Sequence, residues 1–279
     1  MKHSVSPAKI NLSLVVGSVR SDGLHELTSV FQRISIVDYV TVESQPKIDN
    51  AFCEVRGFSG DQLMLKALEV LTAFTEYDGV FQARVKKNIP VAAGLGGGSS
   101  DAGTTLRLAH KLMGSPLSEK TLIKIAFGLG SDVPFFLTVG PQLVEGAGEL
   151  LTPLKLPQDY WVVVALPHAV KKKATGDIFQ KFDEGNGYLG YENRRSDLLK
   201  SLKDNLNLQG IAGFPRNDLA SFSGSESFID LFSNFGAFRA DVSGAGPAVY
   251  GLFHDKDHAE EAADQLRGSC KTWLAVPVA

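Results

Sequence analysis

A glycine-rich stretch that leads directly into a helical pattern constrains this chain most. Residues 94–98 hold four glycines, and three small polar residues, 99–101, follow them. Residues 102–113 then carry apolar side chains at helical spacing until a Gly-Ser-Pro sequence ends the pattern. A glycine loop that opens a helix turns free backbone N–H groups toward an anion, and only glycine lets the backbone approach phosphate oxygens so closely. The sequence therefore predicts a phosphate cradle.

Neither of the two common phosphate-binding patterns fits this loop. A Walker A loop needs a Gly-Lys dipeptide, which the sequence lacks. The dinucleotide fingerprint needs a glycine where Ser99 stands, and its literal match at residues 185–190 follows polar residues instead of a strand. A plain turn is the alternative reading of residues 94–98, but a turn needs one or two glycines, and four cost conformational entropy. The pattern favours a nucleotide cradle of another type.

Composition and charge exclude several classes of protein. The formal net charge of −3 provides no basic surface for nucleic acid, and the longest basic run, Lys171–Lys173, is expected to be a solvated edge. Cys53 and Cys270 are far apart and match no metal-binding spacing, which favours a reducing compartment. The first residues are too polar for a signal peptide, and no apolar run approaches a membrane span. We expect a cytoplasmic protein with no membrane partner.

The length of 279 residues predicts two moderate domains or one large one, and residues 153–157, which begin and end with proline, mark a boundary between residues 1–155 and 156–279. The apolar periodicity predicts a mixed α+β chain. A β-α-β-β-α-β order in the second half predicts helices on one face of an antiparallel sheet. The expected strands are residues 10–16, 38–43, 80–87, 160–166, 238–243, 247–253 and 271–276. The expected helices are residues 61–75, 102–113, 119–127 (capped by Ser118), 176–182, 196–206, 225–234 and 257–266.

Two polar patterns remain open from the residues alone. Lys9 and Asn11 lie two apart on a predicted strand, so they share one face, but a surface strand explains them equally well. Asp132 stands among apolar residues, which suits a turn or N-cap residue as well as a base in a dry pocket, and the cap is favoured.

Three stretches together resemble the signature motifs of the GHMP kinases, which phosphorylate small-molecule hydroxyls with ATP. These are residues 7–12, 90–100 and 243–246. Residues 22–25, 130–134 and 146–149 are similar to the branch that phosphorylates the 2-hydroxyl of a diphosphocytidyl-linked methylerythritol in the non-mevalonate isoprenoid pathway. The resemblance implies a ribosomal-protein-S5-like N-terminal domain, a ferredoxin-like C-terminal domain and an active site in the cleft between them.

The resemblance also implies roles in phosphoryl transfer. Asp132 is the expected general base, and Lys9 is expected to keep its carboxylate ionised and to stabilise charge on the transferring group. ATP and Mg²⁺ are the implied cofactors, with Ser99 or Ser100 near the metal. The implied ATP-binding residues are Lys87, Pro90, Val91, Ala92, Ala93, Gly94, Leu95, Gly96, Gly97, Gly98, Ser99 and Ser100.

For the cytidyl substrate, the resemblance implies that Asn11 and His25 read the edge of the base and that Phe179 stacks on it. Thr175 and Leu24 are expected nearby, and a glycine turn of Ser243, Gly244, Ala245 and Gly246 lies near the site. Whether Lys171–Lys173 helps to hold the substrate diphosphate or is only solvated stays open. Two positions depart from the family. Leu24 stands where an aromatic residue is common, and Gln62, after Asp61, stands where an asparagine is usual.

Two alternatives were weighed against this function. Another GHMP kinase, of the homoserine or mevalonate type, fits the motifs, but His25 and the surroundings of Asp132 favour the cytidyl substrate. A nucleotide-binding regulator without catalysis does not need both Lys9 and Asp132. We expect a monomer or a weak homodimer.

Overall fold

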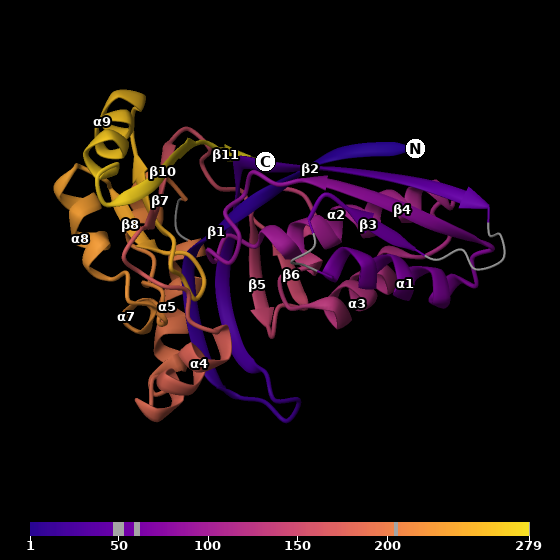
Figure 1. Cartoon of the computed structure of the whole chain (residues 1–279). Helices are drawn as coiled ribbons and strands as arrows, with labels where there is room; N and C mark the ends of the chain where they lie inside the picture. Colours follow the sequence, from indigo (N-terminus) through magenta and orange to yellow (C-terminus); the bar gives the residue numbers. More distant parts are fainter. Residues whose placement is uncertain (47–52, 59–61, 204–205, 279) are drawn as a thin grey trace. The chain divides into compact units, whose positions relative to one another are not determined.

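The computed structural model describes residues 1–46, 53–58, 62–203 and 206–278, and the chain divides into two compact units (Figure 1). The first unit comprises Met1–Ala8, Ile36–Val91 and Gly96–Val139, and the second comprises Lys9–Ser35, Ala92–Leu95 and Gly140–Ala279. Two long strands, β1 (Lys2–Val19) and β2 (His25–Pro46), pair with each other and contribute residues to both units. The predicted division after residue 155 stays a prediction.

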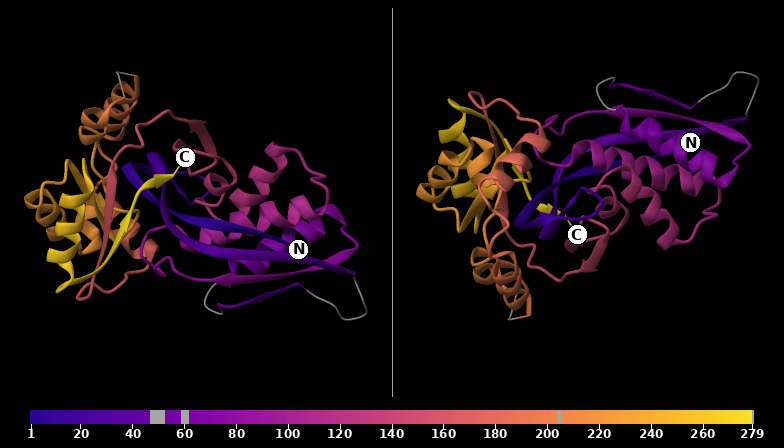
Figure 2. Two further views of the ribbon diagram at one scale, coloured as in Figure 1. Left: turned by 90° about the horizontal axis from the view of Figure 1, so that it is seen from above. Right: turned by 90° about the horizontal axis from the view of Figure 1, so that it is seen from below.

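The first unit combines strands with three helices that cover one face of them. β4 (Gly79–Lys86) pairs antiparallel with residues 39–46 of β2, and β3 (Glu54–Arg56) pairs parallel with β4. Figures 1 and 2 show the helices beside these strands. They are α1 (Leu63–Thr75), α2 (Gly97–Leu112) and α3 (Glu119–Leu129), followed by the 3-10 helix η1 (Pro134–Leu137).

Buried side chains that alternate along β2 and β4 form the sheet side of this unit's core. Successive side chains of a strand point to opposite faces, so every second residue can be buried. On one face, Val40, Val42, Phe81, Ala83 and Val85 pack in one hydrophobic cluster with residues of all three helices. This burial, at about 25 cal/mol per Å² of apolar surface, is the main force that holds the helices on the sheet.

The second unit contains a four-stranded antiparallel sheet in the order β10–β7–β9–β8. Helix α8 (Ser227–Asn234) precedes β8, helix α9 (Lys256–Leu266) joins β9 to β10, and both pack on the sheet in one cluster. This is a ferredoxin-like β-α-β-β-α-β arrangement. The strands are β7 (Trp161–Pro167), β8 (Arg239–Val242), β9 (Val249–Phe253) and β10 (Cys270–Ala275).

Further elements of the second unit pack against the later part of β1 and pair with the first part of β2. β5 (Gln142–Gly146) pairs with residues 27–31 of β2, β6 (Leu150–Pro153) pairs with β5, and β11 (Pro277–Val278) pairs with β2. A third cluster joins Leu14 and Val16 of β1 to Ile178 and Phe182 of α4. The remaining helices are α4 (Thr175–Glu184), α5 (Tyr191–Lys203), α6 (Leu208–Ala212) and α7 (Ala220–Ser223).

The predicted α+β class is confirmed, and each predicted strand and helix has a counterpart in the structure. β1 and β2 are much longer than predicted, and α2 begins at Gly97 inside the glycine run instead of at residue 102. Ser118 caps α3 as predicted, because its side chain accepts a hydrogen bond from the Thr121 N–H. Asp61, the predicted first residue of α1, lies outside the described residues.

Candidate functional site

The second part of the glycine loop forms the N-terminus of α2 in the first unit. Gly96 is the N-cap with a φ of 69°, a left-handed conformation that favours glycine. A Cβ on Gly97 would lie 3.0 Å from Ile89 Cγ2, so a larger residue there would push against the strand side of the loop. The first N–H groups of a helix lack intrahelical partners and carry a partial positive charge. This end of α2 is therefore suited to bind phosphate.

The two serines after the glycines have different surroundings. The Ser100 hydroxyl is fully buried, donates to the Pro7 carbonyl at 2.6 Å and accepts from the Ser6 hydroxyl at 2.8 Å. Ser99 is only partly buried. The hydroxyl of Ser100 thus connects α2 to β1 within the first unit, whereas Ser99 is the more accessible of the two.

Lys87 lies between two buried carboxylates below the loop. Its Nζ donates to Asp38 Oδ2 at 2.5 Å and to Asp101 Oδ2 at 2.6 Å. Asp38 Oδ1 also accepts from the Asn88 and Ile89 N–H groups. Burial disfavours the charge of Lys87, but the hydrogen bonds that it donates to Asp101 and Asp38 outweigh this effect and raise its pKa. Lys87 therefore ties the end of β4 to β2 and α2.

Asp101 is the carboxylate of this network that has an unsatisfied oxygen. Burial raises the pKa of its carboxyl to about 6 despite the adjacent ammonium of Lys87. Its Oδ1 has no hydrogen-bond partner, which a buried polar atom normally has. Asp38 and Asp101 carried no functional signal in the sequence, because nothing marks two residues 63 apart as partners of one lysine.

The first part of the loop belongs to the second unit and contacts the turn of residues 243–246. The Ser243 hydroxyl donates to the Gly94 carbonyl at 3.0 Å, and the Ala248 N–H donates to the Ala93 carbonyl. Gly94 has a φ of 87°, and a Cβ there would lie 2.2 Å from the Ser243 carbonyl oxygen. Glycine is thus required at position 94 because the backbone there lies in close contact with the turn of residues 243–246.

Lys9 and Asn11 form the centre of a polar network in the second unit. Lys9 Nζ donates to Asn11 Oδ1 at 2.7 Å, and the Gly244 N–H donates to the same oxygen at 2.9 Å. The other amide atom of Asn11, Nδ2, donates to the Ser29 hydroxyl at 3.0 Å. Lys9 Nζ also lies 4.4 Å from the ring centroid of Phe31. Both amide atoms of Asn11 therefore have partners within the unit, and its predicted contact with the base stays a prediction.

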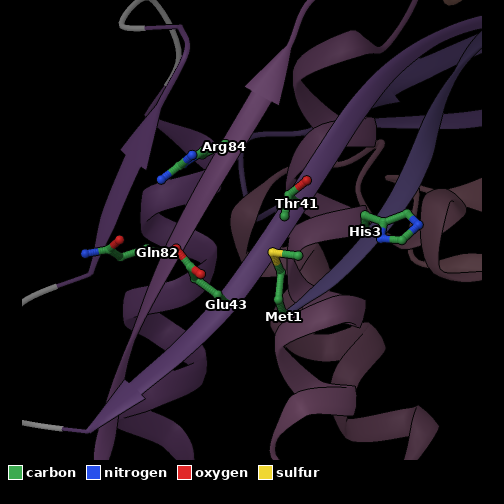
Figure 3. A pocket seen from close by; sticks show the side chains of 6 residues that line it. All are labelled: Met1, His3, Thr41, Glu43, Gln82 and Arg84. Atoms are coloured by element: carbon green, nitrogen blue, oxygen red, sulfur yellow. The ribbon is translucent and has the colours of Figure 1, made fainter.

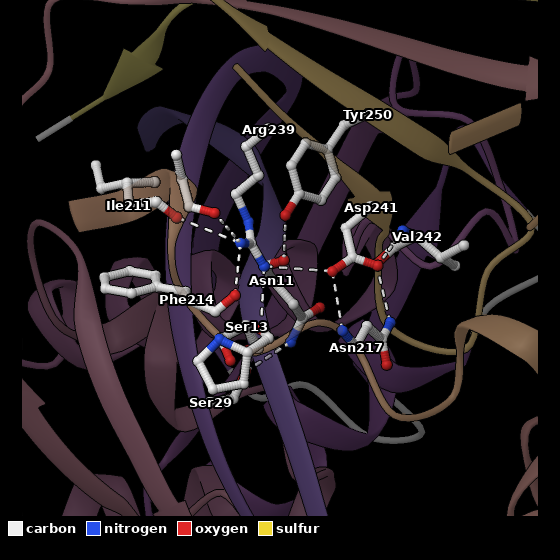
Figure 4. A network of polar contacts seen from close by, with 12 residues as sticks. Asn11, Ser13, Ser29, Ile211, Phe214, Asn217, Arg239, Asp241, Val242 and Tyr250 are labelled. Atoms are coloured by element: carbon white, nitrogen blue, oxygen red, sulfur yellow. Dashed lines mark hydrogen bonds and ion pairs between the residues drawn. The ribbon is translucent and has the colours of Figure 1, made fainter. Parts of the chain in front are cut away.

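A buried arginine supports this network from the sheet side (Figure 4). Arg239 donates to the carbonyls of residues 211, 212, 214 and 215 and to Asp241 Oδ2. Asp241 accepts from the Asn217 N–H, and Asn217 Nδ2 donates to the Gly244 carbonyl at 2.7 Å. The Tyr250 hydroxyl donates to the Asn11 carbonyl at 2.8 Å. The network thereby fixes both Asn11 and the glycine turn.

His25 and Phe179, predicted to bind cytosine, lie together in the second unit. Their ring centroids are 4.6 Å apart with an interplanar angle of 33°. His25 Nε2 is 3.0 Å from Asp183 Oδ1, and the His25 side chain is 11% exposed. Asp183 was not predicted, although it lies four residues after Phe179 and hence on the same face of α4. Leu24 is exposed beside His25 in sequence.

Asp132 lies in the turn between α3 and η1 of the first unit. Its side chain is partly exposed, whereas Val133 and Pro134 are buried. The capping role that the sequence favoured is wrong, because the N-cap of η1 is Val133 and no side-chain cap is formed. Lys9, the other candidate catalytic residue, belongs to the second unit.

A shallow hollow of about 300 Å³ lies on the face of the first unit's strands that the helices do not cover (Figure 3). It contains none of the residues predicted for the site. Its side chains are mixed in charge and come from the first residues of the chain and from the neighbouring strands β2 and β4. They are Met1, His3, Thr41, Glu43, Gln82 and Arg84. We assign it no function.

The described residues contain no preformed metal site. Among them, no group of three or more His, Cys, Asp or Glu side chains could hold a metal ion. Mg²⁺ in nucleotide enzymes is held largely by the phosphates and water, with few protein ligands, so the α2 N-terminus and Ser99 are compatible with it. In the same described part of the chain, no helix has both the length and the apolar character needed to cross a membrane.

Both glycine motifs lie in regions that match models of known protein domains. The chain matches the GHMP kinases N terminal domain over residues 62–140 and the GHMP kinases C terminal domain over residues 195–272. The predicted two-domain fold class is thereby confirmed.

Individual relatives match nearly the whole chain. The 4-diphosphocytidyl-2-C-methyl-D-erythritol kinase of Clostridium botulinum (strain Loch Maree / Type A3) is 32% identical over 275 residues, which cover 96% of both chains. The kinase of the same name from Syntrophus aciditrophicus (strain SB) is 33% identical and covers 96% of this chain and 95% of its own. A crystal structure of 4-(cytidine 5'-diphospho)-2C-methyl-D-erythritol kinase superimposes with a TM-score of 0.80 at 29% identity, with both chains fully covered.

Proposed function

Because this chain belongs to the 4-diphosphocytidyl-2-C-methyl-D-erythritol kinases of the GHMP superfamily, we propose that it phosphorylates the 2-hydroxyl of 4-diphosphocytidyl-2-C-methyl-D-erythritol. It is an ATP-dependent small-molecule kinase of isoprenoid biosynthesis. The observation that carries the proposed substrate is the match over 96% of the chain to relatives of that name. The contact between His25 and Phe179 in the second unit supports it.

The N-terminus of α2 is the proposed cradle for the ATP phosphates. Bound ATP supplies the phosphoryl group, and Mg²⁺ neutralises charge between the phosphates. Gly96 and Gly97 allow the loop backbone to approach the phosphates closely, and the first N–H groups of α2 are free to donate to them. The burial of Ser100 supports Ser99 as the hydroxyl that meets the phosphates or the metal. The ammonium of Lys87 already forms ion pairs with two carboxylates, so we propose that Lys87 positions the loop and does not contact the phosphates.

Asp132 is the proposed general base, which accepts the proton of the substrate 2-hydroxyl as the oxygen attacks phosphorus. Its partial exposure leaves the carboxylate accessible to a substrate. Lys9 is proposed to stabilise the charge that develops on the transferring group. The hydrogen bond from Lys9 to Asn11 fixes the direction of the ammonium, and the buried network behind Asn11 prevents it from relaxing. Phosphoryl transfer depends mainly on such positioning and on electrostatics.

The cytosine base is proposed to bind at His25 and Phe179. If Asp183 accepts the Nε2–H of His25, the neutral imidazole keeps Nδ1 as an acceptor, which suits an exocyclic amino group. Phe179 offers an apolar ring in the middle of α4, and Thr175 is the first residue of that helix. Leu24 adds apolar contact but no aromatic stacking. An aromatic pair contributes about 0.5–1.5 kcal/mol beyond the burial of its apolar surface, and Leu24 lacks this contribution.

Replacement of the base tests the catalytic part of the proposal. Asp132→Asn keeps the shape of the side chain but removes the proton acceptor, so kcat is expected to fall by about 10²–10⁴ with little change in KM for either substrate. Asp159→Asn, at an exposed position, is the matched control and should retain the wild-type kcat. An unchanged kcat in Asp132→Asn would show that another group accepts the proton. Product analysis by ³¹P NMR should find the new phosphate on the 2-hydroxyl.

A further inference from the structure

The sequence singles out the turn of residues 146–149, but the proposed function gives it no role. In the structure this turn folds around its own last side chain, because Glu149 Oε2 accepts the Ala147 N–H at 2.6 Å. Gly146 has a φ of 70°, and a Cβ there would lie 2.7 Å from the carboxylate atoms of Glu149. Glycine at position 146 thus makes room for the carboxylate, and the 146–149 turn is built to hold it.

The other oxygen of this carboxylate binds Arg20, which directly follows β1. Glu149 Oε1 accepts from Arg20 Nη1 at 2.9 Å, and the two side chains are 26% and 28% exposed. The same Nη1 lies 3.7 Å from Glu26 Oε2, so Glu149 is its closer partner. Burial works against the charge of Glu149, but hydrogen bonds from the backbone of its own turn and from Arg20 lower the pKa of its carboxyl. The pair is therefore ionised at neutral pH.

Arg20 also organises the hairpin loop, residues 20–24, between β1 and β2. Its N–H donates to the Leu24 carbonyl at 2.7 Å, and its carbonyl accepts the Gly23 N–H at 3.1 Å. Asp22 Oδ1 accepts the Leu24 N–H at 3.0 Å, and Asp22 Oδ2 lies 3.1 Å from Arg20 Nη2. The backbone and the guanidinium of one arginine thus hold the hairpin loop, and the guanidinium joins it to the 146–149 turn.

The hairpin loop leads directly into the proposed cytosine site. Leu24 is the last residue of the loop, and His25 is the first residue of β2. The 146–149 turn lies beside them, because Leu27 of β2 pairs with Gly146 of β5. An exposed loop that is held only by its flanking strands opens easily, so a side-chain clamp at this point limits how far Leu24 and His25 can move.

We propose that Arg20 and Glu149 are positioning residues of the cytosine site. Their ion pair holds the hairpin loop against the 146–149 turn and thereby fixes where Leu24 and His25 meet the base. Neither side chain contacts the substrate in this role. The identity of the base rests on the proposed function, whereas the coupling of the loop to the turn does not.

Two variants break the clamp from its two sides. Arg20→Met removes the guanidinium, and Glu149→Gln keeps the shape of the anchor but removes its charge. Each should raise KM for 4-diphosphocytidyl-2-C-methyl-D-erythritol about fivefold and leave kcat and KM for ATP unchanged. The double variant should be no worse than either single one, because both break the same contact. Arg20→Lys should recover part of the loss, and Arg267→Met, which breaks an exposed ion pair with Asp264, should resemble wild type.

Amide hydrogen exchange of the substrate-free protein, measured by mass spectrometry, separates this inference from the proposed function. Peptides that contain the hairpin loop should exchange faster in Arg20→Met and Glu149→Gln than in wild type and Arg267→Met. This result supports the clamp even if the enzyme proves to use another substrate. Equal exchange in all four proteins overturns it, and so does faster exchange with an unchanged KM. A raised KM in Arg20→Met but not in Glu149→Gln also overturns it, because Arg20 then contacts the substrate directly.

Discussion

Removal of the Lys87 ammonium should destabilise the protein far more than removal of its exposed neighbour. Lys87→Met leaves Asp38 and Asp101 facing each other with side chains that are 0% and 3% exposed. Breaking a buried ion pair by deleting one partner typically costs about 3–5 kcal/mol, because the remaining charge is uncompensated. Asp38 keeps two backbone N–H donors and Asp101 can take up a proton, so we expect a loss near the lower end, about 3 kcal/mol.

The assay is urea unfolding followed by circular dichroism, with Lys86→Met as the control. Lys86 is exposed and precedes Lys87 on β4, so its replacement should change the free energy of unfolding by less than about 0.5 kcal/mol. Adding Asp101→Asn to Lys87→Met removes one of the two unpaired carboxyls and should recover part of the loss. If Lys87→Met is no less stable than Lys86→Met, the ammonium does not hold the loop and the reasoning is wrong.

Three further predictions concern stability and specificity. The pKa of Asp101 is raised to about 6, so the folded state holds a proton that the unfolded state releases near pH 4. The free energy of unfolding should therefore fall as the pH rises between about 4 and 6. Asp101→Asn should abolish this slope when unfolding is measured as a function of pH. Asp183→Ala should raise KM for the cytidyl substrate but not for ATP and change the His25 tautomer seen by ¹⁵N NMR, whereas Glu184→Ala should do neither. Gly251→Ala should cost about 1–3 kcal/mol in thermal unfolding, because its Cβ would lie 2.4 Å from the Phe232 ring; wild-type stability would contradict the packing.

Local patterns predicted much of the fold because they act over short distances. The Ser118 cap and the alternation on β4 depend on neighbours in the chain, and both are confirmed. The glycines of α2 misled the prediction of its start, since helix propensity disfavours glycine, yet Gly97 and Gly98 form its first turn. Residues 24–36 received no assignment from the sequence, and His25 onward forms β2, whose pairing with β5 depends on residues more than 100 positions away.

The site shows the same division between local and distant information. The glycine loop and the contact of His25 with Phe179 follow from the motifs, because family resemblance places those residues. The sequence did not indicate a role for Arg239, Asp241 and Asn217. They form a buried polar network through hydrogen bonds whose partners no local sequence pattern reveals. The sequence left open whether Lys171–Lys173 is solvated or helps to hold the substrate diphosphate. Lys172 is exposed and also donates to the Gly246 carbonyl, a contact that no local pattern indicates.

The most direct test of the proposed function is ATP consumption by the wild-type protein with three alcohols in parallel: 4-diphosphocytidyl-2-C-methyl-D-erythritol, homoserine and mevalonate. The account predicts turnover with the cytidyl substrate alone. Turnover with homoserine or mevalonate, and none with the cytidyl substrate, would contradict it and would remove the cytosine site at His25 and Phe179, while the kinase assignment would remain.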